Sequence, residues 1–324
     1  GAPGMKGISL FLLPRTLDDG SANHYRIIRL KDKLGTRSMA SGEIRMDGAR
    51  AYLVGEQGRG FVQMADMVNN SRLSNGVRSA GMMRRAVAEA EFIARERIAF
   101  GKRLEQMPLM QRQLDKLRVP AEQARSMVFQ TAQTLARSDA GEPHAYALLR
   151  ILTPLIKFRA CRDARKVTGD AMEVRGGCGY IEEWSDPRLV RDAHLGSIWE
   201  GTSNIVALDV IRAIKREGSL PVLQGYLKGL LDQAGLVPAY RQALEDALAR
   251  ASVLAETAVQ DGGEVLARQA ATGLYNCTTA IAMAWEARQT GSNERLRLSQ
   301  LVLLHRVLPR DPLVAGEIPA AWLE

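Results

Sequence analysis

Short apolar runs separated by turn residues fill the first 60 residues of the 324-residue chain. The runs Ile8–Leu13, Tyr25–Leu30 and Gly42–Met46 have the length and apolar content of β-strands, and turns that contain glycine and aspartate lie between them. About four strands do not easily form a self-sufficient sheet. The pattern therefore predicts part of a β-domain over residues 1–60.

From Phe61 to about Ala99, apolar residues recur with the 3.6-residue period of an amphipathic α-helix. Further helices are predicted at 109–136, where Pro120 can produce a kink, at 143–174, shortly after Pro187, and over about 12 residues from Ile205. A first helix of this length without proline is typical of a bundle. The pattern therefore predicts a four-helix bundle over residues 61–216.

After Gly218 the chain is predicted to be helical again, because charged and apolar residues alternate between opposite faces. These helices are expected near residues 220–231, 236–260, 262–289 and 293–307. The predicted fold class is therefore mainly α, in three parts. They are a partial β-domain (1–60), a four-helix bundle (61–216) and a helical C-terminal extension (217–324).

Composition is that of an ordinary globular protein, with 46% hydrophobic and 25% charged residues. No apolar run approaches 18 residues, so we expect no membrane span. The first residues do not resemble a signal peptide. Cys161, Cys178 and Cys277 are far apart and show no metal-binding spacing, so we expect reduced thiols in a cytoplasmic protein and no metal site.

The net charge of +8 suits an anionic partner such as coenzyme A, a flavin diphosphate or nucleic acid. Residues 72–118 carry eleven basic and five acidic residues, whereas residues 215–324 carry eleven and twelve. The excess positive charge therefore belongs to the middle helices and not to the C-terminal part.

The segment Ser197–Asn204 contains one carboxylate, Glu200, directly before Gly201 and Thr202. Gly201 gives the backbone freedom to direct Glu200 away from the helix axis. Thr202 or Ser203 can cap the following helix by accepting a backbone N–H bond. From these residues alone, Glu200 is either a charge that compensates the positive end of a helix or a reactive carboxylate.

The motif Ile198–Ser203 resembles the catalytic motif of the acyl-CoA dehydrogenases, in which a carboxylate before Gly-Thr removes the α-proton of the substrate. Lys33–Ser38 and Leu53–Phe61 are similar to the second half of that family's β-domain, and the predicted bundle to its C-terminal four-helix bundle. The family's N-terminal helical domain and the first half of its β-domain have no counterpart here. We therefore expect either a fragment or a chain that another polypeptide completes.

The resemblance implies FAD as cofactor. In Arg95–Lys102, Arg97 and Phe100 match the family's Arg-x-x-Phe-Gly segment, in which the arginine binds the flavin diphosphate through a forked guanidinium group. Taken by itself, this segment favours a solvated basic helix end, because Lys and Arg are preferred in C-terminal turns. Pro108 stands where the family usually has a glutamine that bonds the adenosine side.

Two further groups of cofactor-binding residues are implied. Glu173, Gly176 and Gly177 match the family's Gln-x-x-Gly-Gly turn, in which glycines let backbone amides approach the diphosphate, although Glu173 replaces the usual glutamine. Thr202 and Asn204 match positions that touch the flavin ring and the diphosphate. A helix C-cap for the first group and an N-cap for the second are the simpler alternatives.

Arg72 precedes Arg97 by 25 residues, the family's spacing for an arginine near the acyl-CoA pocket. In one branch of the family the residue before this arginine is the catalytic carboxylate, but here it is Ser71, which cannot act as a base. Glu200 is then the candidate catalytic residue, with Arg72 and Gly201 as substrate-binding residues.

The function implied is FAD-dependent α,β-dehydrogenation of acyl-CoA thioesters in fatty acid metabolism. Glu200 would be the base, electron-transfer flavoprotein the electron acceptor, and the protein a homodimer or homotetramer. Trp199 and the continuation Asn204–Val210 are most similar to the AidB-like branch, which is linked to DNA and the alkylation response. A flavoprotein associated with DNA and with little turnover is therefore the alternative, although the charge-balanced extension does not favour DNA binding. A third interpretation is a non-catalytic helical subunit.

Overall fold

The computed structural model describes residues 2–314 and 316–323, and it divides into two compact units at Ser71 and Arg72. Each unit is described by itself. The three-part division at residues 60 and 216 remains a prediction.

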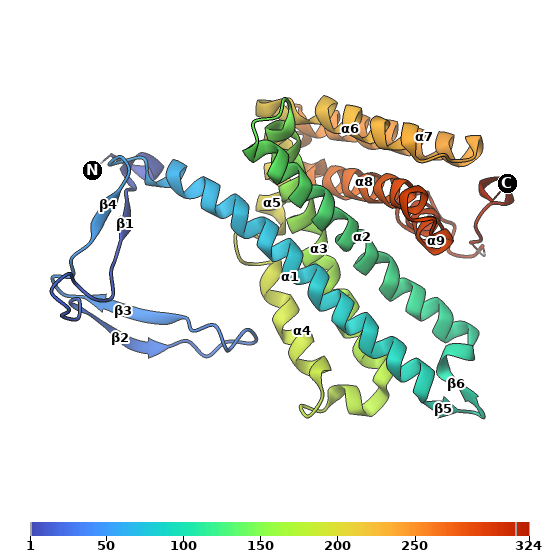
Figure 1. Ribbon diagram of the computed structural model, residues 1–324, viewed down its shortest axis with the longest axis horizontal. Coiled ribbons are helices and arrows are strands. Elements are labelled where there is room, and N and C mark those ends of the chain that lie inside the picture. The colour runs from blue at the N-terminus through green and yellow to red at the C-terminus, as the bar shows by residue number, and fades with distance from the viewer. Residues whose placement is uncertain (1, 315, 324) are drawn as a thin grey trace. The chain divides into compact units, whose positions relative to one another are not determined.

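The first unit contains two antiparallel pairs of strands (Figure 1). Strand β1 (Leu10–Leu12) pairs with β4 (Tyr52–Val54), and β2 (Tyr25–Leu30) pairs with β3 (Gly42–Met46), with a register shift between Ile27 and Arg29. A short 3₁₀ turn, η1 (Gly4–Gly7), precedes them. The predicted strands are therefore confirmed, and they form two-stranded ladders.

Large apolar side chains of these strands are exposed, including those of Leu12, Ile27, Leu30 and Ile44. Two-stranded ladders bury little surface, and they need a further layer for independent stability. The described strands thus match the expectation of a partial β-domain.

The predicted helices of the bundle are confirmed, with ends that differ from the prediction by a few residues. They are α1 (Gly60–Glu96), which contains the division between the units, α2 (Pro108–Asp139), α3 (Ala145–Arg175), α4 (Ser185–Gly196) and α5 (Ser203–Glu217). Pro108 occupies the first turn of α2, where its missing N–H costs nothing, and Pro120 lies inside α2 without ending it.

Helix α3 is the centre of the second unit, because α2, α4, α5, α6 and α8 all pack against it (Figure 1). Residues 151–158 are all buried, and this run covers more than two turns, so buried side chains lie on all sides of the helix. A helix that is apolar all round is typical of a core position. Between α1 and α2 lie the two-residue strands β5 (Ile98–Ala99) and β6 (Lys102–Arg103) and the turn η2 (Leu104–Gln106). Turn η3 (Gly176–Tyr180) follows α3.

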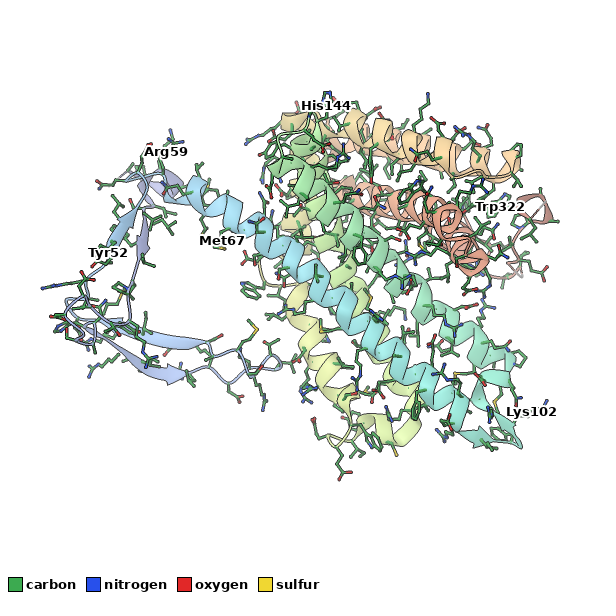
Figure 2. All side chains as sticks on the ribbon, in the orientation of Figure 1. Tyr52, Arg59, Met67, Lys102, His144 and Trp322 are labelled. Atoms are coloured by element: carbon green, nitrogen blue, oxygen red, sulfur yellow. The ribbon has the colours of Figure 1, made fainter. Side chains whose placement is uncertain are left out.

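The C-terminal extension is helical, as predicted. It comprises α6 (Ser219–Gln233), α7 (Pro238–Val259), η4 (Gly263–Leu266), α8 (Ala267–Thr290), α9 (Asn293–Val302), a π-helical turn η5 (Leu303–Val307) and η6 (Ala320–Trp322). Helix α8 packs against α2, α5, α6, α7 and α9, so the extension continues the core of the bundle. Trp322, which Figure 2 labels, packs on Tyr240 with ring centroids 5.1 Å apart.

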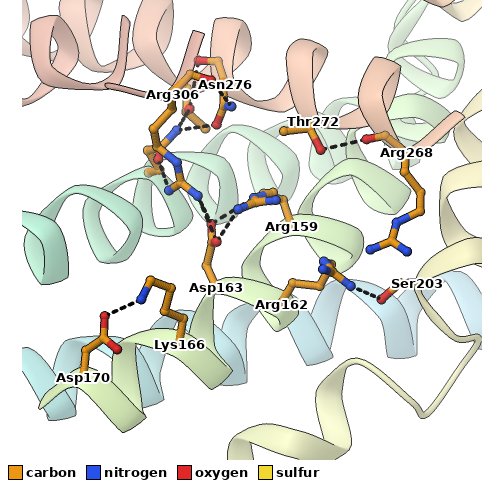
Figure 3. Close-up of polar contacts among 12 residues, drawn as sticks. Arg159, Arg162, Asp163, Lys166, Asp170, Ser203, Arg268, Thr272, Asn276 and Arg306 are labelled. Atoms are coloured by element: carbon orange, nitrogen blue, oxygen red, sulfur yellow. Dashed lines mark hydrogen bonds and ion pairs between the residues drawn. The ribbon is translucent and has the colours of Figure 1, made fainter. Parts of the chain in front are cut away.

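A buried polar network joins the extension to the bundle (Figure 3). The Asp163 carboxylate of α3 accepts hydrogen bonds from Arg306 of η5 at 2.9 Å and from Arg159 at 2.7 Å. Arg306 also donates to Gln123 of α2 at 2.7 Å, and its carbonyl accepts from Asn276 of α8 at 3.1 Å. Because every member has a partner, the network holds α8 and η5 in register with α2 and α3.

None of the helices in residues 2–314 and 316–323 combines the length and apolar character needed to cross a membrane. The three cysteines are free thiols, with Cys161 and Cys277 buried and Cys178 exposed.

Candidate functional site

Glu200 and Gly201 form a sharp elbow between α4 and α5. Glu200 has φ +57° and Gly201 has φ +102°, so both residues have backbone conformations that side chains disfavour. A Cβ atom built on Gly201 would lie 3.3 Å from methyl groups of both Ile205 and Val206. A non-glycine residue with positive φ is held there by its surroundings, and such positions occur often at active sites.

Two cationic side chains hold the carbonyl groups of the elbow. Arg72 of α1 donates from Nε to the Glu200 carbonyl at 3.1 Å, and Lys157 of α3 donates from Nζ to the Gly201 carbonyl. Arg72 also donates from Nη1 to the carboxylate of Asp209, on α5, at 2.7 Å. The backbone that carries Glu200 is therefore fixed by residues of three helices.

Asp209 is the anchor of this arrangement. Its side chain is 5% exposed and forms ion pairs with Arg72, with Arg150 at 3.5 Å and with Arg212 at 3.0 Å. A buried carboxylate needs such partners, because an unpaired buried charge is costly. The middle of α5 is thereby tied to α1 and α3.

Lys157 lies in the apolar run Leu155–Phe158, and although it is a lysine it is almost completely buried. Burial lowers its pKa from 10.5 to about 8; the positive charge of Arg72 also lowers it, whereas Cys161 and Glu200 raise it. Lys157 is not among the predicted site residues. The signal was a single lysine among residues that all face the core.

The predicted hydroxyl cap of α5 is wrong. Thr202 is the N-cap residue by backbone geometry, and its carbonyl accepts from the Val206 N–H at 3.0 Å, but among the described residues its side chain makes no capping bond. The Ser203 hydroxyl accepts from Arg162 at 3.2 Å instead. For Ser203 the physical reason is that a charged donor, Arg162, competes well for the hydroxyl oxygen.

The other predicted cofactor residues gather at the C-terminal end of α3. Arg97 donates from Nη1 to the Arg175 carbonyl at 3.4 Å, and a Cβ atom on Gly176 would lie 2.8 Å from the same nitrogen. Gly176 has φ +71°, and both Glu173 and Gly177 are exposed beside it. A guanidinium group against a glycine turn with accessible backbone fits a diphosphate or an adenosine.

Phe100 lies in the turn of the β5–β6 hairpin with φ +51°, and its side chain is 97% exposed. Arg175 directly precedes the glycine turn and is buried. It forms an ion pair with Asp186 at 2.8 Å, and its guanidinium carbon lies 4.6 Å from the centre of the Trp184 ring. The turn thus rests on a rigid base, whereas Phe100 extends into solvent.

The structure does not bring the two groups of predicted residues together in one chain. Lys157 contacts the elbow, and Arg175 contacts Arg97; these two residues are separated by 18 positions of α3. At a rise of 1.5 Å per residue, the groups lie about 27 Å apart along the helix. Glu200, Gly201, Thr202, Asn204 and Arg72 form one group, and Arg97, Phe100, Glu173, Gly176 and Gly177 form the other.

A groove of about 840 Å³ between α1, α2 and α9 lies elsewhere, and none of the predicted site residues lines it. Its walls are ion-paired residues such as Glu91, Asp115, Arg118 and Arg297. These pairs satisfy one another, so this groove adds nothing to the site.

Comparisons with known proteins match part of the chain to a family. Residues 58–215 match the acyl-CoA dehydrogenase C-terminal domain. The chain is 37% identical over 211 residues to acyl-CoA dehydrogenase family member 11 of Caenorhabditis elegans, covering 64% of this chain and 34% of that protein. It is 38% identical over 214 residues to the putative acyl-CoA dehydrogenase AidB of Escherichia coli, covering 66% and 39%.

The crystal structure of Caenorhabditis elegans ACDH-11 in complex with C11-CoA is similar, with a TM-score of 0.88 and 29% identity over 95% of this chain and 55% of that one. The chain thus spans between about a third and two fifths of the two curated relatives. Both the predicted fold class and the predicted resemblance are confirmed. Residues 58–215, just under half of the chain, match the acyl-CoA dehydrogenase C-terminal domain, and this match carries the family resemblance.

Proposed function

We propose that this chain supplies the base and part of the cofactor site of an FAD-dependent acyl-CoA dehydrogenase. The observation that carries the proposal is the elbow, in which the backbone of Glu200 has a left-handed conformation and cations bond both of its carbonyl groups. Such preorganisation directs one carboxylate to a fixed position, as the abstraction of a weakly acidic proton requires.

In the proposed reaction the Glu200 carboxylate takes the α-proton of the acyl thioester and becomes a carboxylic acid. The backbone N–H of Glu200 donates to the thioester oxygen as negative charge develops on it. FAD, when bound, supplies the acceptor for the hydride that leaves the β-carbon, and the α,β double bond forms. Arg72 and Lys157 act earlier, because they hold the elbow in place.

The separation of the two groups of cofactor residues supports a site shared between subunits, as the family resemblance implies. The elbow of one subunit, with Thr202 and Asn204, would contact the flavin end. The Arg97 group of a second subunit, with the exposed Phe100, would contact the adenosine end. A homodimer or homotetramer is therefore part of the proposal.

The substrate and electron acceptor follow from the same family. The similar ACDH-11 structure was solved with C11-CoA, which supports an acyl-CoA substrate here. We propose electron-transfer flavoprotein as the acceptor. The three free thiols support a reducing compartment such as the cytoplasm.

Replacing Glu200 tests the proposal. Glu200→Gln keeps the shape of the side chain but removes the base, so the variant should retain flavin and lose turnover by about 10²- to 10⁴-fold. Flavin content is read from absorbance, and turnover is followed with acyl-CoA and an artificial electron acceptor.

Glu217→Gln is the matched control, because Glu217 is exposed at the other end of α5. It should leave turnover unchanged. Equal rates in Glu200→Gln and in the wild-type chain would remove Glu200 from the role of base.

The second candidate, a DNA-associated flavoprotein, is supported by the similarity to AidB. The charges of the extension oppose it. Arg241, Arg295, Arg297 and Arg306 all form ion pairs with carboxylates, so they are not available for phosphates. We therefore propose the dehydrogenase, and a DNA affinity that falls steeply with salt would favour the alternative.

A further inference from the structure

Three arginines from two helices surround the segment Ser197–Asn204. We call them the arginine cluster, and they are Arg162 and Arg165 of α3 and Arg268 of α8. Arg165 donates from Nη1 to the Ser197 hydroxyl at 3.3 Å, on the N-terminal side of the elbow. The positions 162 and 165 are three residues apart, so both side chains lie on one face of α3.

The other two members reach the segment after the elbow. Arg162 donates from Nη1 to the Ser203 hydroxyl at 3.2 Å, and Arg268 donates from Nη1 to Asn204 Oδ1 at 3.4 Å. Figure 3 shows the guanidinium groups of Arg162 and Arg268 approaching each other beside Ser203. Two positive groups therefore converge on the residues that begin α5.

Within the residues that the structure describes, no member of the arginine cluster forms an ion pair with a carboxylate. Arg162 is partly buried, whereas Arg165 and Arg268 are exposed. Other arginines that are buried or partly buried do form ion pairs: Arg159 and Arg306 pair with Asp163, and Arg175 pairs with Asp186. The cluster thus carries positive charge whose protein partners are neutral hydroxyl and amide oxygens. Guanidinium groups bind such oxygens less strongly than they bind carboxylates or phosphates.

The electrostatics of Arg162 agree with this geometry. Burial lowers its pKa most, and the positive charges of Arg268, Arg159 and Arg165 lower it further, whereas Asp163 raises it. An anion among these groups would relieve both the repulsion and part of the desolvation.

The backbone adds donors at the same place. Helix α5 has 15 residues, and no side chain caps its N-terminus among the described residues. The N–H groups of its first turn and the positive end of its dipole belong to Ser203 and Asn204, the residues that Arg162 and Arg268 contact. An anion there would accept from both backbone and guanidinium donors.

We propose that the arginine cluster binds the phosphate groups of a nucleotide: the diphosphate of a flavin dinucleotide or the phosphates of coenzyme A. The inference rests on the proposed function, because these are the two phosphate-bearing ligands of that reaction. Arg268 lies outside the matched region 58–215. The C-terminal extension thereby contributes directly to nucleotide binding, in addition to its packing against the bundle.

The test compares the full chain with Arg268→Gln and Arg162→Gln. FAD binding is measured by flavin fluorescence and coenzyme A binding by calorimetry, each at low and at high salt. We expect each substitution to lower the affinity for the ligand that the cluster binds by about 10- to 100-fold, because a hydrogen bond to a charged group is lost. The affinity of the unsubstituted chain for that ligand should fall with salt.

Arg288→Gln is the matched control, since it removes the same charge from the exposed surface of α8 about 30 Å away along the helix. It should bind both ligands as the unsubstituted chain does. Arg268→Lys keeps the charge but loses the fork, so its affinity should be intermediate. Arg268 is exposed, and we expect Arg268→Gln to keep the unfolding temperature of the unsubstituted chain.

The outcomes separate the sources of the phosphate. Weaker FAD binding alone assigns the cluster to the dinucleotide diphosphate, and weaker coenzyme A binding alone assigns it to the thioester carrier. Unchanged affinity for both ligands in folded variants overturns the inference and leaves the proposed function standing. An unsubstituted chain that binds neither ligand overturns the proposed function, and the inference with it.

Discussion

Lys157 shows how one side chain supports the elbow. Its ammonium group is buried among apolar residues and donates to the Gly201 carbonyl. Arg72 acts in the same way on the Glu200 carbonyl, but it also has the Asp209 carboxylate as a partner. Lys157 donates to a backbone carbonyl instead, and the negative charge of Glu200 also favours its charged form.

This difference predicts how stability changes with pH. Below about pH 8 Lys157 is charged in the folded chain, and the full cost of burying the charge is present. As the pH rises from about 8 toward 10.5, the folded chain releases this proton before the unfolded chain does, so stability increases. The free energy of unfolding of the wild-type chain should rise relative to that of Lys157→Met by up to about 1.4 kcal/mol per pH unit.

Urea unfolding of both proteins measures this difference in the free energy of unfolding. The measurements are made at several pH values from about 7.5 to about 10, which is roughly the range between the two pKa values. A difference between the two proteins that stays constant over this range would contradict a lowered pKa for Lys157.

At the scale of elements, α3 connects the site with the extension. One end of α3 carries Arg175 beside the glycine turn, its middle carries Lys157 at the elbow, and Asp163 between them pairs with Arg306 of η5. A change in the docking of η5 and α8 should therefore affect the stability of the whole second unit.

Replacing Asp163 tests this role. Asp163→Ala leaves Arg159 and Arg306 partly buried without their carboxylate, which should destabilise the chain by about 3–5 kcal/mol. Asp170→Ala, on the same helix, removes only an exposed pair with Lys166 and should cost about 0.5 kcal/mol. Chemical unfolding measures both, and equal losses would show that the Asp163 network does not join the elements.

The helices could be predicted from sequence because apolar residues recur about every 3.6 residues over a continuous stretch of chain, as they do after Phe61. The elbow could be located because Glu200, Gly201 and Thr202 are adjacent. The contacts that hold it could not, because Lys157 lies 44 positions from Gly201 and Arg268 lies 64 positions from Asn204. A cap by the Ser203 hydroxyl failed for the same reason: local chemistry favoured it, but a tertiary contact from Arg162 replaced it.

At the scale of the whole molecule, the two groups of cofactor residues lie too far apart to act as one cluster in one chain. The proposal assigns them to different subunits around a shared cofactor. This arrangement predicts complementation between two inactive variants, one in each group.

Co-expression of Arg97→Gln with Glu200→Gln should restore activity. A mixed dimer has one site with both residues intact and one with neither, so random pairing gives about a quarter of wild-type activity. Turnover is assayed at an FAD concentration that leaves Arg97→Gln free of flavin. Activity no greater than that of either variant alone would show that the groups belong to the same site or to different functions.

The most direct measurement of the central claim is the flavin absorbance of the purified protein under anaerobic conditions, before and after acyl-CoAs of several chain lengths are added. The wild-type protein should be yellow and should lose its oxidised-flavin absorbance with at least one acyl-CoA, whereas Glu200→Gln should bind the same flavin and keep its absorbance. A flavin-loaded wild-type protein that no acyl-CoA bleaches, or a Glu200→Gln variant that bleaches as fast as the wild type, would contradict the account.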